Sequence, residues 1–244
     1  MESGTGLSVG RWASGDKLRA LSLKRDGSAS KARVRASEPV SIDAVRWNHN
    51  IHYHSMILGA LGSGRGRVLD VGYGEGILAR ELLQIADHAT AIDLDRTSCR
   101  PGSTSGQGQR DRVPRRRFPD PSFRTASFDA IVSVAALHHM DAGSVLGRMR
   151  QLLRPAGTLA IVGLARSRVP ADLPLDLAAV VVNLAHKARK PYWEHSAPTV
   201  WAPPARYADM RRTAAQELPG VRYRRHLLWR YSLVWTKPKR EASR

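Results

Sequence analysis

Cysteine is almost absent from this sequence, and long apolar runs are absent altogether. Cys99 is the one cysteine among the 244 residues, which excludes an intramolecular disulfide framework and a zinc site built from cysteines. No segment approaches the roughly 18 consecutive apolar residues of a membrane-spanning helix. The N-terminal residues also lack the apolar centre of a secretory signal. We therefore expect a cytoplasmic protein with no membrane partner.

Acidic residues are few compared with basic ones. The chain has 39 lysines and arginines against 21 aspartates and glutamates, a formal net charge of +18. Such an excess is typical of nucleic-acid partners. However, residues 41–95 carry 4 basic and 7 acidic side chains, and only 7 of the 39 basic residues are lysine, a bias that a GC-rich coding sequence explains. A nucleic-acid partner is therefore possible but not favoured.

The chain divides into three parts by composition. Residues 1–40 are rich in Ser, Gly and basic side chains without apolar periodicity, which predicts a disordered basic leader. Residues 41–238 have the patterning of one domain, and residues 239–244 form a tail. Within the domain we expect an N-terminal helix over 41–64, a core over 65–165, a lid over 166–206, and a C-terminal helix and strand pair over 207–238.

The core shows an alternation of strands and helices. Short apolar runs predict buried strands at 67–71, 89–93, 128–134 and 158–163, and helical spacing predicts helices at 77–86 and 144–153. A strand, a helix and a second strand within about 27 residues make a βαβ unit, which requires parallel pairing. Further helices are expected at 175–188 and 207–218, and antiparallel strands at 221–227 and 231–236. The prediction is an α/β fold with a doubly wound, mostly parallel sheet and an antiparallel C-terminal edge.

Residues 96–126 do not fit this alternation. They should supply the next helix and strand, yet they contain four prolines, eight arginines and a single Val, Ile, Leu or Met residue, Val113. The spacing from Asp93 to Asp129 is nevertheless what a helix, a strand and their loops would occupy. The segment is either a genuine surface insertion or a stretch translated out of frame, and translation of the DNA in the other two frames distinguishes the two.

A glycine motif follows the first strand of the core. In VLDVGYGEG (68–76) the glycines stand at positions 72, 74 and 76, whereas a dinucleotide-binding G-x-G-x-x-G motif would need its third glycine at position 77. Glycines are required where a ligand lies against the backbone of a strand-to-helix turn. Asp70 precedes the motif, which suits a ligand with an ammonium group. Asp93 ends the second strand, where a carboxylate binds ribose hydroxyls.

With these motifs the sequence resembles the class I S-adenosylmethionine-dependent methyltransferases, in particular those that act on small molecules. The matching segments are VLDVGYGEG (68–76), AIDLD (91–95), SFDAIVSVAALHHM (127–140), LLRPAGTLAIVGLA (152–165) and YRRHLLWRYSLVWTKP (223–238). The resemblance covers residues 45–238 apart from 96–126. It implies a Rossmann-like fold, S-adenosylmethionine as cofactor and methyl transfer driven mainly by positioning.

The resemblance also implies roles for individual residues. Gly72, Gly74 and Gly76 would line the methionine and ribose, Asp70 would hold the amino group, Asp93 would bind the ribose, Leu94 would pack on the adenine and the Val134 backbone would face the methionine. Two departures stand out. Tyr73 replaces the usual small residue between the first two glycines, where its ring crowds the cofactor or leans outward. The acidic residue that meets the adenine amino group has no counterpart in 96–126.

The catalytic residue is not identified by the sequence. His138 and His139 follow the 128–134 strand at the ligand end of the sheet and are the candidate bases, although capping or packing explains them equally well. The polar cluster at 48–54 and the lid contain the candidate substrate-binding residues Tyr53, Trp193 and Trp201. No acidic residue is spaced with the histidines as a metal site requires, so no metal is expected. Arg224, Arg225 and Arg230 are expected on a solvated strand face.

The acceptor is predicted to be a small molecule, and the protein a monomer or homodimer. One alternative is an RNA methyltransferase, which the charge favours. Against it, residues 134–137 read Val-Ala-Ala-Leu, without the prolines of enzymes that methylate exocyclic base amines. A second alternative is a catalytically impaired protein, because 96–126 cannot supply the third strand of the sheet.

Overall fold

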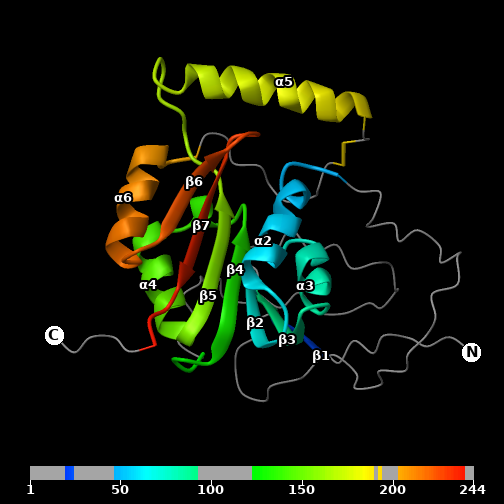
Figure 1. Ribbon diagram of the computed structural model, residues 1–244, viewed down its shortest axis with the longest axis vertical. Coiled ribbons are helices and arrows are strands. Elements are labelled where there is room, and N and C mark those ends of the chain that lie inside the picture. Colours follow the sequence, from blue (N-terminus) through cyan, green and yellow to red (C-terminus); the bar gives the residue numbers. More distant parts are fainter. Residues whose placement is uncertain (1–19, 25–46, 93–122, 190–191, 194–202, 240–244) are drawn as a thin grey trace, which may run out of the picture.

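The computed structural model describes residues 20–24, 47–92, 123–189, 192–193 and 203–239, which form one sheet with helices on both faces (Figure 1). The paired strands of this part of the chain lie in the order β1-β3-β2-β4-β5-β7-β6. Their bounds are β1 Ala20–Lys24, β2 Arg65–Val71, β3 Ala86–Ile92, β4 Phe128–Val134, β5 Leu153–Gly163, β6 Arg222–His226 and β7 Arg230–Thr236. The helices are η1 Ile51–Tyr53, α2 His54–Leu61, α3 Ile77–Leu82, η2 Leu137–His139, α4 Ala142–Leu152, α5 Leu173–Arg189 and α6 Tyr207–Glu217.

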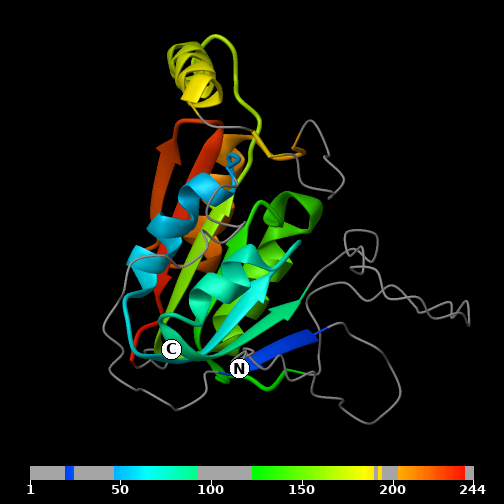
Figure 2. The same cartoon turned by 90° about the vertical axis from the view of Figure 1, so that its right-hand side faces the viewer.

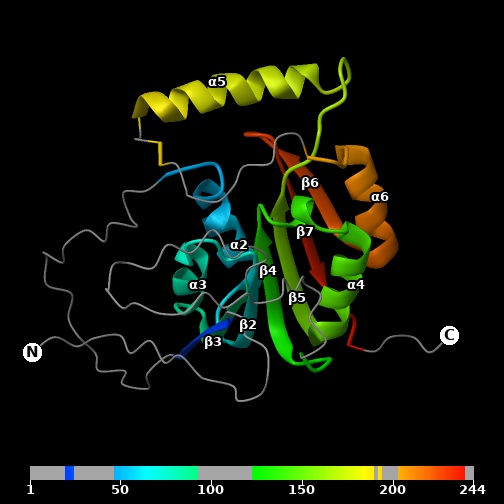
Figure 3. The ribbon, with the colours of Figure 1, turned by 180° about the vertical axis from the view of Figure 1, so that it is seen from behind.

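Four central strands, β3, β2, β4 and β5, run parallel, and β7 and β6 continue the sheet in antiparallel pairing. This arrangement confirms the predicted doubly wound, mostly parallel sheet with an antiparallel C-terminal edge. Helices α2 and α3 cover one face, and α4 and α6 cover the other (Figures 1 and 3). Helix α5 lies apart from both layers, across the end of the sheet at which β5 finishes (Figure 2).

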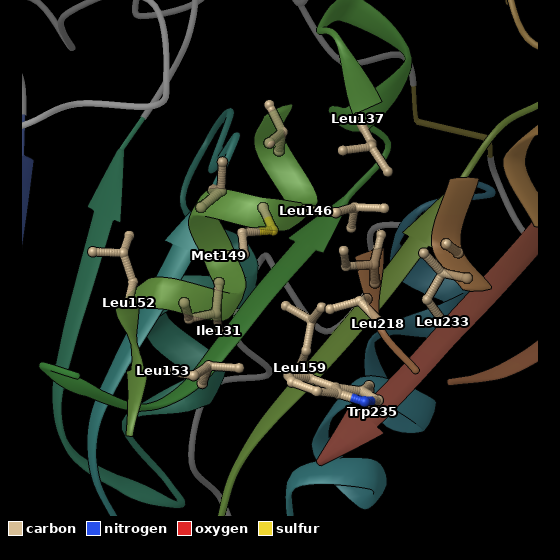
Figure 4. Close-up of a cluster of buried hydrophobic side chains, with 14 of the residues drawn as sticks. Ile131, Leu137, Leu146, Met149, Leu152, Leu153, Leu159, Leu218, Leu233 and Trp235 are labelled. Carbon is tan, nitrogen blue, oxygen red and sulfur yellow. The ribbon is translucent and has the colours of Figure 1, made fainter. Parts of the chain in front are cut away.

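The two faces of the sheet are buried by alternate residues of the same strands. On β4, Ile131 packs into the cluster beneath α4 and α6, with Met149 and Leu218 among its members (Figure 4). Its neighbour Val132 belongs to the cluster on the opposite face, with Leu78 of α3. Successive side chains of a strand point to opposite faces, so a strand covered on both sides is apolar throughout. Strand β4 occupies the predicted residues.

Strand β5 is assigned from Leu153, directly after helix α4, and the expected turn lies inside it as an irregularity of the pairing. The side chain of Asp141 caps α4 by accepting a hydrogen bond from the Ser144 backbone amide at 2.9 Å, so the helix begins two residues before the predicted start. Residues 154–157 were expected to form the turn after the helix. They do so within β5, whose pairing with β4 passes from Leu153 opposite Phe128 to Thr158 opposite Ala130, and Ala156 has a left-handed φ of 63°. Ala156 and Gly157 also exchange backbone hydrogen bonds with Lys237 beyond β7.

The N-terminal helix predicted over 41–64 is shorter in the structure. Residues 41–46 lie outside the described residues, and the helical segment starts at η1. The side-chain oxygen of Asn48 accepts hydrogen bonds from the backbone amides of Asn50 and Ile51, both at 2.9 Å. Such a local side-chain turn competes with helix formation, which explains the later start.

Part of the predicted disordered leader is a strand. Residues 20–24 form β1, which pairs antiparallel with β3 from Ala20 opposite Ile92 to Lys24 opposite His88. β1 takes the edge position beside β3 that the strand expected from 96–126 would occupy in a doubly wound sheet. Most of 96–126 lies outside the described residues, as do Asp93, Leu94 and Trp201. The leader thus supplies an edge strand that its composition does not predict.

Candidate functional site

The turn between β2 and α3 is built from glycines in a conformation that other residues rarely adopt. Gly72, Gly74 and Gly76 have φ angles of 82°, 52° and 73°. A Cβ atom is disfavoured in this left-handed region, which explains why the turn contains three glycines. The backbone amide of Gly72 donates to the carbonyl of Ile92 at 2.7 Å, so the turn is tied to the end of β3.

Two of these glycines have very different surroundings. A Cβ atom added to Gly72 would lie 2.2 Å from the Cβ of Ala136, so the turn after β2 packs directly on the turn after β4. The hydroxyl of Ser133 also joins these strands by donating to the Val71 carbonyl at 2.8 Å. A Cβ atom on Gly74 would have no described atom within 4 Å. The turn is therefore closed at Gly72 and open at Gly74.

Tyr73, the residue between these two glycines, is half buried. It packs against the small cluster of Ala79 and Ala91, which belong to α3 and β3. The phenol therefore leans toward the helix and strand behind the turn. The ring also stays close to the turn, because a Cβ atom added to Gly76 would lie 3.7 Å from Tyr73 Cδ2, so both orientations expected from the sequence stay predictions.

Two histidines lie in η2 after β4, shortly after the Ala136 that contacts the glycine turn. The rings of His138 and His139 are 3.9 Å apart between centroids. The Nδ1 atom of His138 is buried and has no hydrogen-bond partner among the described residues. Burial lowers the pKa of His138 to about 4, and the charges of His139 and Arg230 act in the same direction. His138 is therefore a neutral hydrogen-bonding group at pH 7 and a weak base.

The polar cluster at 48–54 contacts α5 and the β6–β7 hairpin. His49 Nε2 is 2.8 Å from the side-chain oxygen of Asn183, and the ring of Trp47 stacks on His186 with 4.8 Å between centroids. The hydroxyl of Tyr53 donates to the Leu227 carbonyl at 2.6 Å. Burial raises the pKa of Tyr53 to about 12, so this phenol stays protonated at neutral pH.

A cavity of about 390 Å³ lies between this cluster, α5 and the hairpin. Tyr53 lies on its wall, whereas Trp193 does not and instead forms a backbone hydrogen bond with Trp47. The sequence did not predict most of the lining, which comes from the inner side of α5 and from the hairpin. The lining residues are His52, Tyr53, Leu175, Val182, Arg225, His226, Leu227 and Leu228.

Arg225 and Arg230 are not on a solvated strand face as expected. Arg225 pairs with Asp172 and lies over the ring of Tyr207, 3.9 Å from its centroid. Arg230 is only 6% exposed, and its guanidinium donates to the Leu228 carbonyl at 3.0 Å and to the Asn50 side chain at 2.8 Å. Burial lowers its pKa to about 10, so it remains charged at neutral pH.

Comparison with known proteins identifies the family of this chain. A family model described as a methyltransferase domain matches residues 69–161. Uncharacterised methyltransferases of Mycobacterium bovis and Mycobacterium tuberculosis are each 35% identical over 193 residues, which is 79% of this chain and 98% of theirs. The chain belongs to the class I S-adenosylmethionine-dependent methyltransferases. S-adenosylmethionine is accordingly its cofactor.

More distant relatives of this methyltransferase include a ubiquinone biosynthesis O-methyltransferase of Xylella fastidiosa. That protein is 29% identical over 161 residues, which is 64% of each chain. Among solved structures, a S-adenosylmethionine-dependent methyltransferase of Methanosarcina mazei has a TM-score of 0.47 and 17% identity, over 79% of this chain and 99% of that one.

The glycine turn of the methyltransferase fits the cofactor. The open space at Gly74 is where a ligand can lie against the backbone, and Asp70 is buried on β2 immediately before the turn. Val134 ends β4, next to the turn that contacts Gly72. The structure thus brings together five of the seven predicted cofactor-binding residues, and the other two, Asp93 and Leu94, lie outside its described part. Nothing in the described part groups three or more His, Cys, Asp or Glu residues for a metal ion, and no helix there is long and apolar enough to cross a membrane.

Proposed function

We propose that this methyltransferase acts on a small-molecule acceptor held over the carboxyl end of the sheet, between the glycine turn and His138. Two observations carry the proposal: the open space that the described residues leave at Gly74, and a buried His138 Nδ1 without a hydrogen-bond partner among them, in the turn that contacts Gly72 through Ala136. A nitrogen in this state loses solvation without a compensating hydrogen bond, and an acceptor hydroxyl or amine would supply that bond.

The cofactor is proposed to lie along the turn. Gly72, Gly74 and Gly76 would line its methionine and ribose portions, and Val134 would face the methionine through its backbone. Asp70 would meet the ammonium group. Asp93 and Leu94 complete the proposed set at the ribose and the adenine. When bound, S-adenosylmethionine supplies a methyl group that is already activated by its sulfonium.

The transfer is a displacement in line. The bound cofactor would supply an electrophilic methyl group, and the acceptor would present its lone pair in line with the bond between that methyl group and the sulfur. The acceptor loses its proton to solvent or to a nearby base. Because the pKa of His138 is about 4, this residue is better suited to orient the acceptor through a hydrogen bond than to remove a proton from a weak acid. His139, which is exposed, is the alternative base. Positioning therefore supplies most of the acceleration.

The acceptor class is proposed from two features. The relatives include a ubiquinone biosynthesis O-methyltransferase, whose name places its activity in the synthesis of a small molecule. Tyr53 and the apolar side chains of α5 border a cavity of about 390 Å³, which is within the usual size range of small-molecule sites. Its lining includes neither the glycine turn nor His138, so this cavity would hold the part of the acceptor remote from the methyl group. Trp193 and Trp201 stay predictions as acceptor contacts. The cytoplasmic location and the oligomeric state also stay predictions.

The test measures release of S-adenosylhomocysteine with two kinds of acceptor, a panel of phenols, catechols and amines and a preparation of total transfer RNA. We expect product with members of the panel and none with RNA. His138→Gln should raise KM for that acceptor more than it lowers kcat, as expected for a residue that orients it. Methylation of RNA that falls steeply with salt and is lost on deleting residues 1–19, which leaves β1 in place, would instead establish the nucleic-acid alternative.

A further inference from the structure

Three polar residues of helix α5, Asp176, Asn183 and His186, face the rest of the molecule, beside Leu175 and Val182. The carboxylate of Asp176 accepts a hydrogen bond from the Ser167 hydroxyl at 2.9 Å, and the ring of His186 stacks on Trp47. Asn183 holds His49 at 2.8 Å. A helix that packs on a globular core normally does the reverse and places its apolar stripe inward. Apart from Lys187 and Arg189 in its last turn, the exposed residues of α5 are apolar.

This outer face is an aliphatic stripe. Leu173, Leu177, Val180, Val181 and Leu184 recur at the spacing of one helix face, and they are 45%, 59%, 43%, 65% and 61% exposed. Every exposed large apolar residue of the described chain lies between residues 169 and 192. The helix itself runs along the outside of the molecule, beyond the end of the sheet (Figures 1 and 2). Exposed apolar surface concentrated in this way marks an interaction site.

The charges around the stripe are of one sign. Between residues 166 and 189 the exposed charged side chains are those of Arg166, Arg168, Lys187 and Arg189. Both carboxylates of this range are turned away from the outer face, Asp172 in its pair with Arg225 and Asp176 in its bond with Ser167. Basic residues therefore flank the aliphatic stripe at each end of α5, with no exposed acidic residue between them.

The aliphatic stripe and its basic flanks distinguish between two occupants of the outer face of α5, a second copy of the chain and an anionic lipid bilayer. A second copy of the chain would also carry a formal charge of +18 and would be repelled. A helix face about 25 Å long and about 10 Å wide offers about 250 Å², against about 800 Å² per partner in a standard protein interface. An anionic bilayer attracts the basic flanks and takes up the stripe without any matching surface.

We propose that α5 is an interfacial helix that docks this protein on an anionic lipid surface, with the stripe among the acyl chains and Lys187 and Arg189 among the headgroups. The absence of a long apolar run led us to expect no membrane partner, because a spanning helix needs one. A helix that lies in the surface needs only one apolar face. The proposal is independent of the acceptor and of catalysis.

The test is co-sedimentation of the full chain with phosphatidylcholine vesicles, with and without phosphatidylglycerol. We expect binding to the anionic vesicles that weakens at high salt, and little binding to the neutral ones. The triple variant L177Q/V181Q/L184Q keeps every charge and removes the stripe, so its binding should fall at least about tenfold. K187Q/R189Q should weaken binding severalfold, whereas the matched control R211Q/R212Q, on α6, should leave it unchanged.

Three results would overturn the proposal. One is a wild-type chain that stays in the supernatant with both kinds of vesicle. Another is a triple variant that sediments as well as the wild type, which would assign the binding to basic charge elsewhere in the chain. The third is a dimer, seen by analytical ultracentrifugation, that the triple variant dissociates, because a second copy would then be the occupant. A melting temperature of the triple variant equal to that of the wild type shows that its fold is retained.

Discussion

Replacing Gly74 by alanine tests whether the cofactor lies against the glycine turn. The added methyl group can block the ligand, and the left-handed backbone adds a separate cost in stability. The new Cβ would meet no described atom within 4 Å, so it clashes with nothing in the described part of the chain and projects into the proposed ligand space. The left-handed φ of 52° costs an alanine about 1 kcal/mol. For a chain of this size that lowers the melting temperature by about 2–4 °C.

Gly220→Ala is the matched control. Gly220 has a φ of 81° and also has open space at its Cβ position, but it lies between α6 and β6, at the opposite end of the sheet from the glycine turn. Its backbone strain should be similar. Any difference in ligand affinity between the two variants therefore results from the position of the added methyl group and not from backbone strain.

The assay is calorimetric titration with S-adenosylhomocysteine, alongside thermal melts of both variants. Gly74→Ala should lose at least about tenfold in affinity, equivalent to about 1.4 kcal/mol, while Gly220→Ala binds as the wild type does. If Gly74→Ala binds with unchanged affinity, the ligand does not lie against this turn and the assignment of the cofactor site is wrong.

Three further predictions concern stability. Gly72→Ala should destabilise the fold by about 2–4 kcal/mol in urea titrations, because its Cβ would meet that of Ala136; the double variant G72A/A136G should recover the steric part, and no recovery would refute this packing. Deleting residues 1–24 should lower the free energy of unfolding by about 1–3 kcal/mol through loss of the β1–β3 pairs. Deleting residues 1–19 leaves β1 in place and is the control. Equal stability of the two deletions would contradict the pairing. Burial raises the pKa of Asp129, but hydrogen bonds from Arg154 and the Arg67 amide outweigh it and hold that pKa below its usual value. The stabilisation is therefore present above the unfolded pKa of the carboxyl and is lost as pH falls through the folded pKa. Asp129→Asn should cost about 0.5–1 kcal/mol at pH 7 and nothing in acid, and a cost independent of pH would count against the pairing.

The central sheet could be predicted because its residues carry the information locally. β4 is apolar on both faces, and α4 repeats buried residues at helical spacing, so each pattern specifies its element. The glycine turn was equally clear, because positive φ angles require glycine at the observed spacing. The ends of helices and strands were harder to predict. The side chain of Asn48 bonds to the backbone before η1, and Gly157 bonds to Lys237, far along the chain.

Long-range features could not be predicted in this way. β1 forms because a distant strand presents a free edge, and nothing in the composition of residues 20–24 indicates that edge. The burial of Arg230 follows from its position beneath the residues around Asn50, which lie 180 positions earlier in the chain. The periodicity of α5 indicated a helix, but periodicity does not say which face meets the protein. The sequence therefore could not show that the apolar face lies outside.

The most direct measurement of the central claim is a thermal melt with and without S-adenosylhomocysteine. At a hundred times its dissociation constant, a ligand that binds only the folded state adds about 2.7 kcal/mol, or about 5–10 °C for a chain of this size. We predict a shift of that size in the wild type and a smaller one in Gly74→Ala at the same concentration. A cooperative melt that saturating ligand does not move would contradict the claim that the glycine turn of this chain holds the cofactor.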